Sequence, residues 1–213
     1  MDEQEINKPL RVILIGGPSN VGKSTLAQSL AALLSWACAS TDRLARYPGR
    51  PWGSVRPHVA EHYLSLSPEQ LVEDVIRHYM SLRPAIQNLI MTPAADPAAE
   101  RLILEGSAVW PESVVDLRAD GVGALWLTAS DSFLQRRIYA ASEYDGAPDR
   151  ERVIIDKFLG RVQRYNQRML EDVRRFGLPW VNVEETASLA ELTERSLRIV
   201  NHIFDPSSLD NGR

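Results

Sequence analysis

Residues 16–25, Gly-Gly-Pro-Ser-Asn-Val-Gly-Lys-Ser-Thr, have the composition of a phosphate-binding loop. The spacing is glycine, four free positions, glycine, lysine and a hydroxyl residue, met by Gly17, Gly22, Lys23 and Ser24. Glycines let backbone N–H groups approach phosphate oxygens because no Cβ stands in the way. Lys23 would reach the outer phosphates of a nucleotide, and the Ser24 hydroxyl would bind magnesium. We expect nucleotide contacts from Gly17, Ser19, Asn20, Val21, Gly22, Lys23, Ser24 and Thr25.

A phosphate-binding loop of this kind needs a strand before it and a helix after it. Residues 10–15 form an apolar run rich in branched side chains, which is typical of a strand buried on both faces. Leucines then recur at helical spacing, at Leu26, Leu30, Leu33 and Leu34. The positive end of that helix would face the phosphates. A glycine-rich turn that binds nothing stays the alternative, although this context argues against it.

Four further apolar runs predict strands, at 36–41, 102–106, 122–128 and 179–183. Helical periodicity separates these runs. Strands that alternate with helices pair in parallel through right-handed crossovers. The sequence therefore predicts an α/β fold, a single three-layer α/β/α domain over residues 1–213.

Start and stop signals divide the intervening helices. Residues 67–70, Ser-Pro-Glu-Gln, combine a capping serine, an early proline and a glutamine placed to bond back. The step from Arg83 to Pro84 predicts a break, with a shorter helix that ends near Met91 before a proline-containing connector. An apolar residue every three or four positions predicts a long helix from about 151 to 176, which Gly160 could interrupt.

Three polar or proline-rich segments are expected to be less regular. Residues 47–54 hold too many prolines and glycines for a helix or strand, and predict a shaped loop within an acceptor-binding region at about 42–92. Residues 142–152 are polar, so we predict a lid over about 137–155. The polar tail 205–213 is expected to fray.

Composition narrows the classes of function. The 213 residues carry a net charge of −4, which argues against a broad attraction to nucleic acid. No run approaches the roughly 18 apolar residues that span a bilayer, and the N-terminus has no apolar signal core. We therefore expect a cytoplasmic protein with neither a nucleic-acid nor a membrane partner. The single cysteine, Cys38, excludes an intrachain disulfide framework and is expected to be a small buried core residue rather than a nucleophile.

Two carboxylates follow predicted strands, at the edge where ligands bind in open α/β sheets. Glu105 could hold magnesium with Ser24, directly or through water, or contact the acceptor; an acid merely exposed at a strand end is the alternative. Asp42 could accept the proton of an attacking hydroxyl or align that hydroxyl; a helix cap is the alternative. Beside it, Arg43 and Arg46 could pair with an anionic substrate.

Arginines near the predicted lid could stabilise charge that develops during phosphoryl transfer. We select Arg137 and Arg150 for this catalytic role. Further along, arginines form a stripe beside the apolar face of the long helix, and a solvated basic face is the alternative for them: Arg161, Arg164, Arg168 and Arg175. The histidines near the acceptor-binding region could line its pocket or simply pack: His58, His62 and His78.

Three stretches carry a family resemblance: residues 12–25, Ser-Thr-Asp-Arg at 40–43 and Leu-Glu-Gly at 104–106. They look like those of 2-phosphoglycerate kinase and its relatives among P-loop kinases. The layout is similar to nucleoside monophosphate kinases, shikimate and gluconate kinases, and chloramphenicol phosphotransferase. The resemblance implies a five-stranded sheet of order 2-3-1-4-5, a lid, Mg2+, and transfer of the γ-phosphoryl group of ATP to a small-molecule hydroxyl. It assigns phosphate and magnesium contacts to Lys23 and Ser24, the substrate-side acid to Asp42, and lid arginines to Arg137 and Arg150.

Several functions remain open at this level. A phosphotransferase for an antibiotic or other secondary metabolite would share every nucleotide-side residue. A regulatory ATPase switch would use the same loop, although a GTPase switch is weakened by the lack of an Asn-Lys-x-Asp signature. A polynucleotide kinase would need a basic groove. GTP stays an alternative donor to ATP, and the sequence leaves a monomer and a homodimer open.

Overall fold

A parallel sheet lies at the centre of the protein in the computed structural model, which describes residues 10–44, 47–117 and 119–204, the last three by backbone alone. The strands are β1 (Val12–Gly16), β2 (Ala37–Ser40), β3 (Leu102–Glu105), β4 (Val122–Thr128) and β5 (Trp180–Asn182). They form one five-stranded sheet of order β2-β3-β1-β4-β5, with every pairing parallel. The predicted fold class and strand order are confirmed.

The register brings the carboxyl ends of the central strands to one edge. Ile15 of β1 is aligned with Glu105 of β3, and Ser40 of β2 is aligned with the same glutamate. The phosphate-binding loop leaves β1 directly after Gly16. Three segments distant in sequence therefore meet where the strands end, which is the edge at which open α/β sheets bind ligands.

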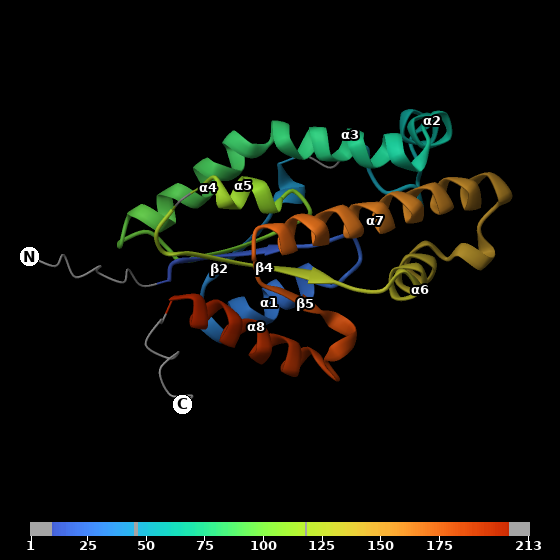
Figure 1. The fold of residues 1–213 in the computed structure, drawn as a ribbon. Coiled ribbons are helices and arrows are strands. Elements are labelled where there is room, and N and C mark those ends of the chain that lie inside the picture. The colour runs from blue at the N-terminus through green and yellow to red at the C-terminus, as the bar shows by residue number, and fades with distance from the viewer. Residues whose placement is uncertain (1–9, 45–46, 118, 205–213) are drawn as a thin grey trace, which may run out of the picture.

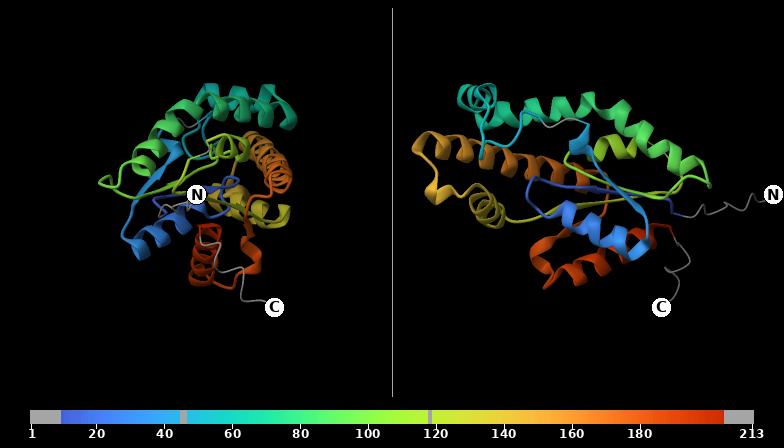
Figure 2. Two further views of the ribbon diagram at one scale, coloured as in Figure 1. Left: turned by 60° about the vertical axis from the view of Figure 1, so that its left-hand side comes forward. Right: turned by 180° about the vertical axis from the view of Figure 1, so that it is seen from behind.

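Helices cover both faces of the sheet (Figure 1). One face carries α1 (Lys23–Leu34) and α8 (Leu189–Phe204), which also contact each other, as the view from behind in Figure 2 shows. The other carries α3 (Pro68–Ser81), α4 (Arg83–Ala95), α5 (Pro111–Val115) and the long α7 (Asp149–Arg175). Near the loop end of the sheet, α2 (Pro57–Ser65) and α6 (Asp131–Ser142) both pack against α7. The three-layer arrangement is thus complete.

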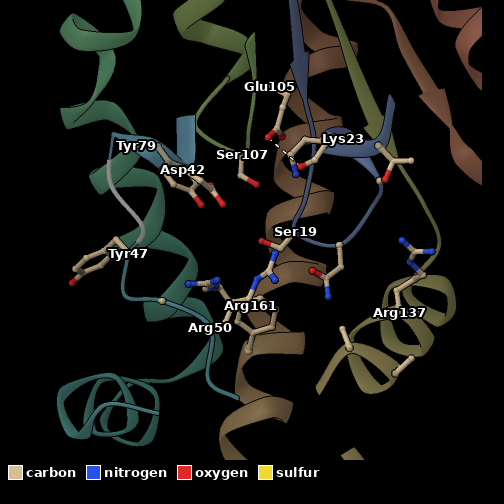
Figure 3. A pocket seen from close by; sticks show the side chains of 18 residues that line it. Ser19, Lys23, Asp42, Tyr47, Arg50, Tyr79, Glu105, Ser107, Arg137 and Arg161 are labelled. Carbon is tan, nitrogen blue, oxygen red and sulfur yellow. Dashed lines mark hydrogen bonds between the residues drawn. The ribbon is translucent and has the colours of Figure 1, made fainter. Parts of the chain in front are cut away.

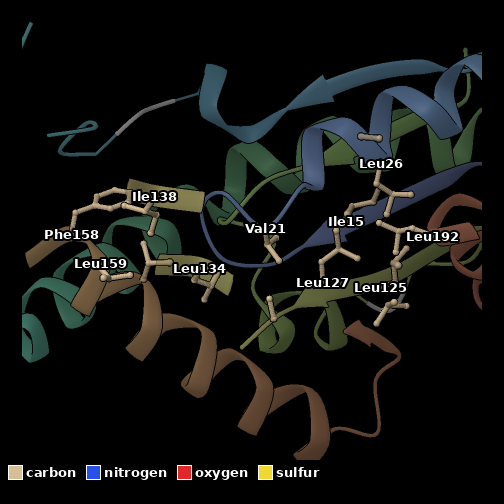
Figure 4. Close-up of a cluster of buried hydrophobic side chains, with 14 of the residues drawn as sticks. Ile15, Val21, Leu26, Leu125, Leu127, Leu134, Ile138, Phe158, Leu159 and Leu192 are labelled. Atoms are coloured by element: carbon tan, nitrogen blue, oxygen red, sulfur yellow. The ribbon is translucent and has the colours of Figure 1, made fainter. Parts of the chain in front are cut away.

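Alternation along β1 explains why two cores form. Ile13 and Ile15 are fully buried in the cluster on the α1 and α8 side, which continues through Leu127 toward Phe158 (Figure 4). Val12 and Leu14 are equally buried in the opposite cluster. Since successive side chains of a strand point to opposite faces, a continuous apolar run is what a strand covered on both sides requires.

Several expectations about individual elements need correction. Helix α4 continues to Ala95 with Pro93 inside it, where a connector was expected, because Ile90 and Pro93 are buried against the sheet side. Gly160 does not interrupt α7, which runs through it without a break; a Cβ there would meet the Cβ of Pro68 in α3 at an ordinary contact distance of 3.4 Å. Helices α2 and α5 were not expected.

Cys38 is exposed and not, as expected, a buried core residue. It lies on β2, which is at the edge of the five-stranded sheet formed by the described residues. Edge strands have a neighbour on one side only, so their side chains are covered less completely. Within the described ranges, no helix combines the length and the hydropathy needed to cross a bilayer.

Most of the polar segment 142–152 is helical. Helix α6 ends at Ser142, a short 3-10 helix η2 (Tyr144–Gly146) follows, and α7 begins at Asp149. The rings of Tyr139 and Tyr144 stack at 3.9 Å, and both hydroxyls donate to the carboxylate of Asp156, at 2.8 and 2.9 Å. The connection between the helices is therefore short and held to α7 in this structure. A lid over about 137–155 remains a prediction, and the tail 205–213 lies outside the described residues.

Candidate active site

The backbone of the loop after β1 requires glycine at two positions. Gly17 and Gly22 have φ angles of 141° and 110°, in the left-handed region that side chains disfavour. A Cβ on Gly17 would also lie 2.6 Å from the carbonyl oxygen of Leu127. The loop can therefore curl back against β4 only with glycine at position 17, which explains the spacing seen in the sequence.

The N-terminus of α1 is left open by the same loop. Gly22 is the N-cap residue and offers no side-chain hydrogen bond to the first backbone N–H groups of the helix. Because those groups have no partner within the helix, they carry partial positive charge and can bind phosphate oxygens. Ser19, Asn20, Lys23, Ser24 and Thr25 line the cavity in front of this helix end.

Lys23 is held inside the site without a nucleotide. Its side chain is 7% exposed, and Nζ donates a hydrogen bond of 2.7 Å to the carbonyl oxygen of Pro18. Burial lowers the pKa of Lys23 to about 8; the nearby carboxylates of Glu105 and Asp42 oppose this shift, and Arg50 adds to it. A phosphate group beside Nζ would stabilise the ammonium form and raise this pKa again.

Two oxygen groups of the kind that binds magnesium meet across the sheet edge. The Ser24 hydroxyl donates a hydrogen bond of 3.1 Å to Oε1 of Glu105, whose side chain is 6% exposed. Both are hard oxygen ligands, and the described residues contain no group of three or more His, Cys, Asp or Glu side chains that could enclose a metal by themselves. This donor set fits Mg2+, which usually combines one or two protein oxygens with phosphate and water.

A cavity of about 550 Å3 extends from the loop across the sheet edge (Figure 3). This volume falls within the usual range of small-molecule sites. Besides the phosphate-binding loop and α1, the lining comes from the segment after β2, from the end of β3 and the segment after it, from the 47–54 loop and from α3, α6 and α7: Asp42, Tyr47, Gly49, Arg50, Tyr79, Glu105, Ser107, Arg137, Ala140, Ala141, Phe158 and Arg161.

Asp42 reaches the cavity because two strand ends pack very closely. It lies in the 3-10 helix η1 (Thr41–Arg43), where the Ser40 hydroxyl accepts a hydrogen bond from its backbone N–H at 3.3 Å. A Cβ on Gly106 would come within 1.8 Å of Oγ1 of the buried Thr41. In Figure 3, Asp42 lies beside Tyr79 on the side of the cavity away from Arg137.

Ser107 ties the loop to the rest of the site. Its hydroxyl donates to the carbonyl oxygen of Gly17 at 3.0 Å, and its own carbonyl oxygen accepts from the Tyr165 hydroxyl at 2.6 Å. These buried bonds connect the loop, the end of β3 and α7. The sequence analysis missed Ser107, although its place two residues after Glu105 puts it at the same sheet edge.

Arg161 is the most unusual side chain in the lining. It is 5% exposed, and its guanidinium carbon lies 4.7 Å and 5.5 Å from the ring centroids of Phe158 and Tyr63. The buried Nη1 atom has no hydrogen-bond partner among the described residues. The sequence analysis placed Arg161 in a stripe beside the apolar face. Its spacing of three and four residues from Phe158 and Tyr165 puts it on that face, which is the signal that was missed.

The remaining predicted residues are placed as follows. Arg137 of α6 lines the cavity, with its guanidinium carbon 5.9 Å from the Phe133 centroid. Arg150 is exposed and lines a different surface depression, with α2, so this structure does not bring it to the cavity. Arg43 is exposed and does not line the cavity. Val21 is buried in the apolar cluster, and Arg46 lies outside the described residues.

A second cavity of about 650 Å3 adjoins the first and shares Tyr47, Gly49 and Arg50 with it. His58 and His62 line this second cavity. His78 instead stacks on Tyr47, at 4.7 Å between ring centroids. The three histidines named from the sequence therefore surround the 47–54 loop, while none lines the main cavity.

Comparisons with known proteins agree on the fold. Neither family models nor the sequences of curated proteins give a match to this chain. Among solved structures, a gluconokinase from Sinorhizobium meliloti 1021 aligns with a TM-score of 0.54 and 16% identity, over 96% of this chain and 99% of that one. Shikimate kinase from Aquifex aeolicus vf5 aligns with a TM-score of 0.50 and 14% identity, over 90% and 97%. Deoxyadenosine kinase from M. mycoides with bound dATP also aligns with a TM-score of 0.50 and 14% identity, over 90% of this chain and 99% of that one. The chain therefore shares the three-layer fold of these P-loop kinases.

Proposed function

We propose that this protein is a phosphotransferase that moves the γ-phosphoryl group of ATP to a hydroxyl of a small molecule, with magnesium. The observation that carries the proposal is that the phosphate-binding loop with Lys23 shares one cavity with the carboxylate of Asp42. A site that only bound a nucleotide would not need an acid across the cavity from the loop. The names of the three structural neighbours, all kinases of small molecules, support the same class.

The donor side of this reaction would use the loop and α1. Backbone N–H groups at the open N-terminus of α1 would bind phosphate oxygens, and Lys23 would contact the β- and γ-phosphates. Lys23 is already directed by its bond to Pro18, so binding of the nucleotide would exchange a backbone carbonyl for phosphate oxygens. GTP stays an alternative donor, since the residues that would read the base are not distinguished by this geometry.

Ser24 and Glu105 would hold magnesium, the Ser24 hydroxyl as a direct ligand and Glu105 directly or through water. When bound, the ion neutralises charge on the β- and γ-phosphate oxygens. The close contact of the two side chains means that neither has to move far to face the same ion. Glu105 in the position of the more usual aspartate has a longer side chain, which suits this contact between the end of β3 and the start of α1.

Asp42 would act on the acceptor. In the transfer, the acceptor oxygen forms a bond to the γ-phosphorus while the bond from that phosphorus to the bridging oxygen breaks, and ADP leaves with the electron pair. The acceptor proton passes to a carboxylate oxygen of Asp42 and then to solvent. Arg137 would stabilise charge on the transferred group from the α6 side. Arg150 could join it only if the 143–148 connection moved toward the cavity.

A phosphoryl-transfer assay tests this proposal. The purified chain is incubated with Mg2+ and ATP carrying a labelled γ-phosphate, together with a panel of small alcohols and hydroxy acids. We expect label to move to an organic acceptor, and Lys23→Ala to abolish the transfer. Lys157→Ala is a matched control, because Lys157 bonds the Leu66 carbonyl oxygen outside the cavity. Transfer that persisted in Lys23→Ala would reject the mechanism.

A further inference from the structure

The buried guanidinium of Arg161 is the starting point. Among the described residues it has no carboxylate within ion-pair distance, and its Nη1 has no hydrogen bond although it is buried. The three other arginines of the stripe named from the sequence are paired and more exposed: Arg164 with Glu69, Arg168 with Glu73 and Arg175 with Asp172. Arg161 therefore differs from the solvated stripe in which its sequence position places it.

The aromatic rings beneath Arg161 do not replace an anion. Phe158 and Tyr63 attract the cation through their π faces. They cannot accept the in-plane N–H hydrogen bonds of the guanidinium, which has five donors and no acceptor. A charge taken out of water without hydrogen bonds destabilises the fold, so such a group usually has a partner. The cavity is the side from which that partner can arrive, because Arg161 lines it.

A second arginine lies in the same part of the cavity. Arg50 lines it from the 47–54 loop, has no ion-pair partner among the described residues, and lies 5.9 Å from the Trp52 ring centroid. Figure 3 shows Arg50 and Arg161 between Tyr47 and Ser19, with Asp42 and Tyr79 nearby, while Arg137 lies on the other side of the loop. The two guanidinium groups thus lie on the same side of the phosphate-binding loop as Asp42, where the acceptor would bind.

We propose that Arg161, with Arg50, forms an anion-binding subsite that selects an acceptor carrying a carboxylate or a phosphate close to the hydroxyl that is phosphorylated. That the bound anion is the acceptor rests on the proposed phosphotransferase function. The anion-binding subsite itself can be tested without turnover. The guanidinium fork matches both groups, since each offers two oxygens for parallel hydrogen bonds. Neutral alcohols would leave the arginine unsatisfied and bind more weakly.

A rival assignment gives both arginines to the nucleotide, as ligands of its γ-phosphate. The two assignments differ in what happens when the loop is already filled. If the arginines serve the nucleotide, a saturating ATP analogue occupies them and no further anion binds there. If they serve the acceptor, the subsite stays open to a second anion.

Equilibrium binding separates these assignments. The full chain is saturated with Mg2+ and a non-hydrolysable ATP analogue, and inorganic phosphate, acetate or glycerol is titrated in by calorimetry. We expect phosphate or acetate to bind and glycerol not to bind. Arg161→Met should lower the affinity for the anion by about tenfold or more. Arg168→Met, on the same helix outside the cavity, should match the wild type. Absence of binding by both anions, or binding that survives in Arg161→Met, would overturn the assignment.

A second variant guards against misfolding. Arg161→Lys keeps the charge but not the fork, and should restore part of the affinity lost in Arg161→Met. In the transfer assay, D-glycerate, glycerol 3-phosphate and glycerol form a matched set. The amount of label transferred to each shows whether the subsite recognises a carboxylate or a phosphate. An acceptor that proves to be neutral would also overturn the inference. If anions bind through Arg161 but no label is transferred to any acceptor, the proposed function fails and the anion subsite stands.

Discussion

The Ser24 hydroxyl donates a 3.1 Å hydrogen bond to Oε1 of Glu105, joining residues 81 positions apart in the sequence. Ser24 is fixed at the start of α1 by the loop, and Glu105 is fixed at the end of β3 by its register with Ile15. The contact therefore depends on the strand order of the sheet. It is the feature that most directly supports the proposed magnesium site at this edge.

Replacement of Glu105 by glutamine should raise the magnesium requirement. The amide oxygen can still accept the hydrogen bond from Ser24, but the negative charge that attracts the ion is lost. We expect the magnesium concentration for half-maximal activity to rise by about tenfold or more. The measurement is activity against Mg2+ at saturating ATP, with the exposed Glu112→Gln as control. Identical magnesium curves for Glu105→Gln and the wild type would argue against this role.

Asp42→Asn should lower the rate of transfer more than the affinity for nucleotide. An amide keeps the size of the side chain but accepts a proton poorly, so kcat should fall by about a hundredfold to ten-thousandfold. Binding of an ATP analogue should change by less than about twofold, because Asp42 lies across the cavity from the loop. Asp172→Asn, in a half-buried pair with Arg175 outside the cavity, is the control. A kcat close to that of the wild type would contradict a role for Asp42 in the transfer.

Lys23→Met should stabilise the nucleotide-free protein at neutral pH. The folded-state pKa of Lys23, about 8, lies below its ordinary value of 10.5, so burial of the ammonium weakens the fold below about pH 8. That penalty is relieved as the pH rises from about 8 toward 10.5. Allowing for the lost hydrogen bond to Pro18, we expect the free energy of unfolding of Lys23→Met to exceed that of the wild type by about 1–2 kcal/mol at pH 7 and by less at pH 9.5.

Urea unfolding of the nucleotide-free wild type and Lys23→Met at both pH values measures this difference. The nucleotide should show the opposite preference, because phosphates favour the protonated lysine: its affinity should fall as the pH rises above about 8. A Lys23→Met variant less stable than the wild type at pH 7 would show that the lysine is not held at such a cost.

Adjacent arginines on α6 offer a matched comparison. Arg137 lines the cavity, whereas Arg136 points to Glu184 at 3.8 Å and is largely exposed. We expect Arg137→Met to lower kcat by about a hundredfold, since it removes a cation that faces the transferred group. The kcat of Arg136→Met should lie within about twofold of that of the wild type. Equal effects of the two substitutions in the steady-state rates would remove Arg137 from the mechanism.

Gly106 should be intolerant of a side chain. Its φ of 152° and the 1.8 Å approach of a built Cβ to Thr41 Oγ1 mean that alanine forces the ends of β2 and β3 apart. We expect Gly106→Ala to reduce the free energy of unfolding by about 2 kcal/mol. At Gly146 a Cβ would meet nothing within 4 Å, so Gly146→Ala should change the free energy of unfolding by no more than about 0.5 kcal/mol. Denaturant unfolding of both variants compares them directly, and equal stabilities would contradict the packing described at Thr41.

The fold could be predicted because its signals are local. The β1 run is apolar at every position, so it had to be covered on both faces, and the loop glycines have φ angles that their spacing anticipates. Ser67 and Gln70 form the expected capping box. Pro93 and Gly160 misled the prediction of helix ends: Pro93 is buried inside α4, and Gly160 lies in the middle of α7, whose buried residues extend from Ile154 to Val173.

The side of the cavity that we propose for the acceptor was harder to predict, because its residues converge through tertiary packing. Arg161 was visible as an arginine on α7, but its isolation follows from where Phe158 and Tyr63 lie around it. Arg50 comes from a loop whose shape no periodicity describes. Ser107 became significant only when its hydroxyl was found on the Gly17 carbonyl oxygen. By contrast, the sequence alone indicates a site at the loop motif and at strand ends, which is where four of the predicted residues lie: Lys23, Ser24, Asp42 and Glu105.

The most direct test of the central claim follows the γ-phosphoryl group itself. The full chain, Mg2+ and ATP labelled in the γ-phosphate are incubated with a fractionated pool of small metabolites, and the label is traced by chromatography. The proposed function predicts labelled organic phosphate that appears with the wild type and disappears with Lys23→Ala. Label found only as inorganic phosphate, whatever small molecule is supplied, would contradict a phosphotransferase and favour a nucleotide hydrolase.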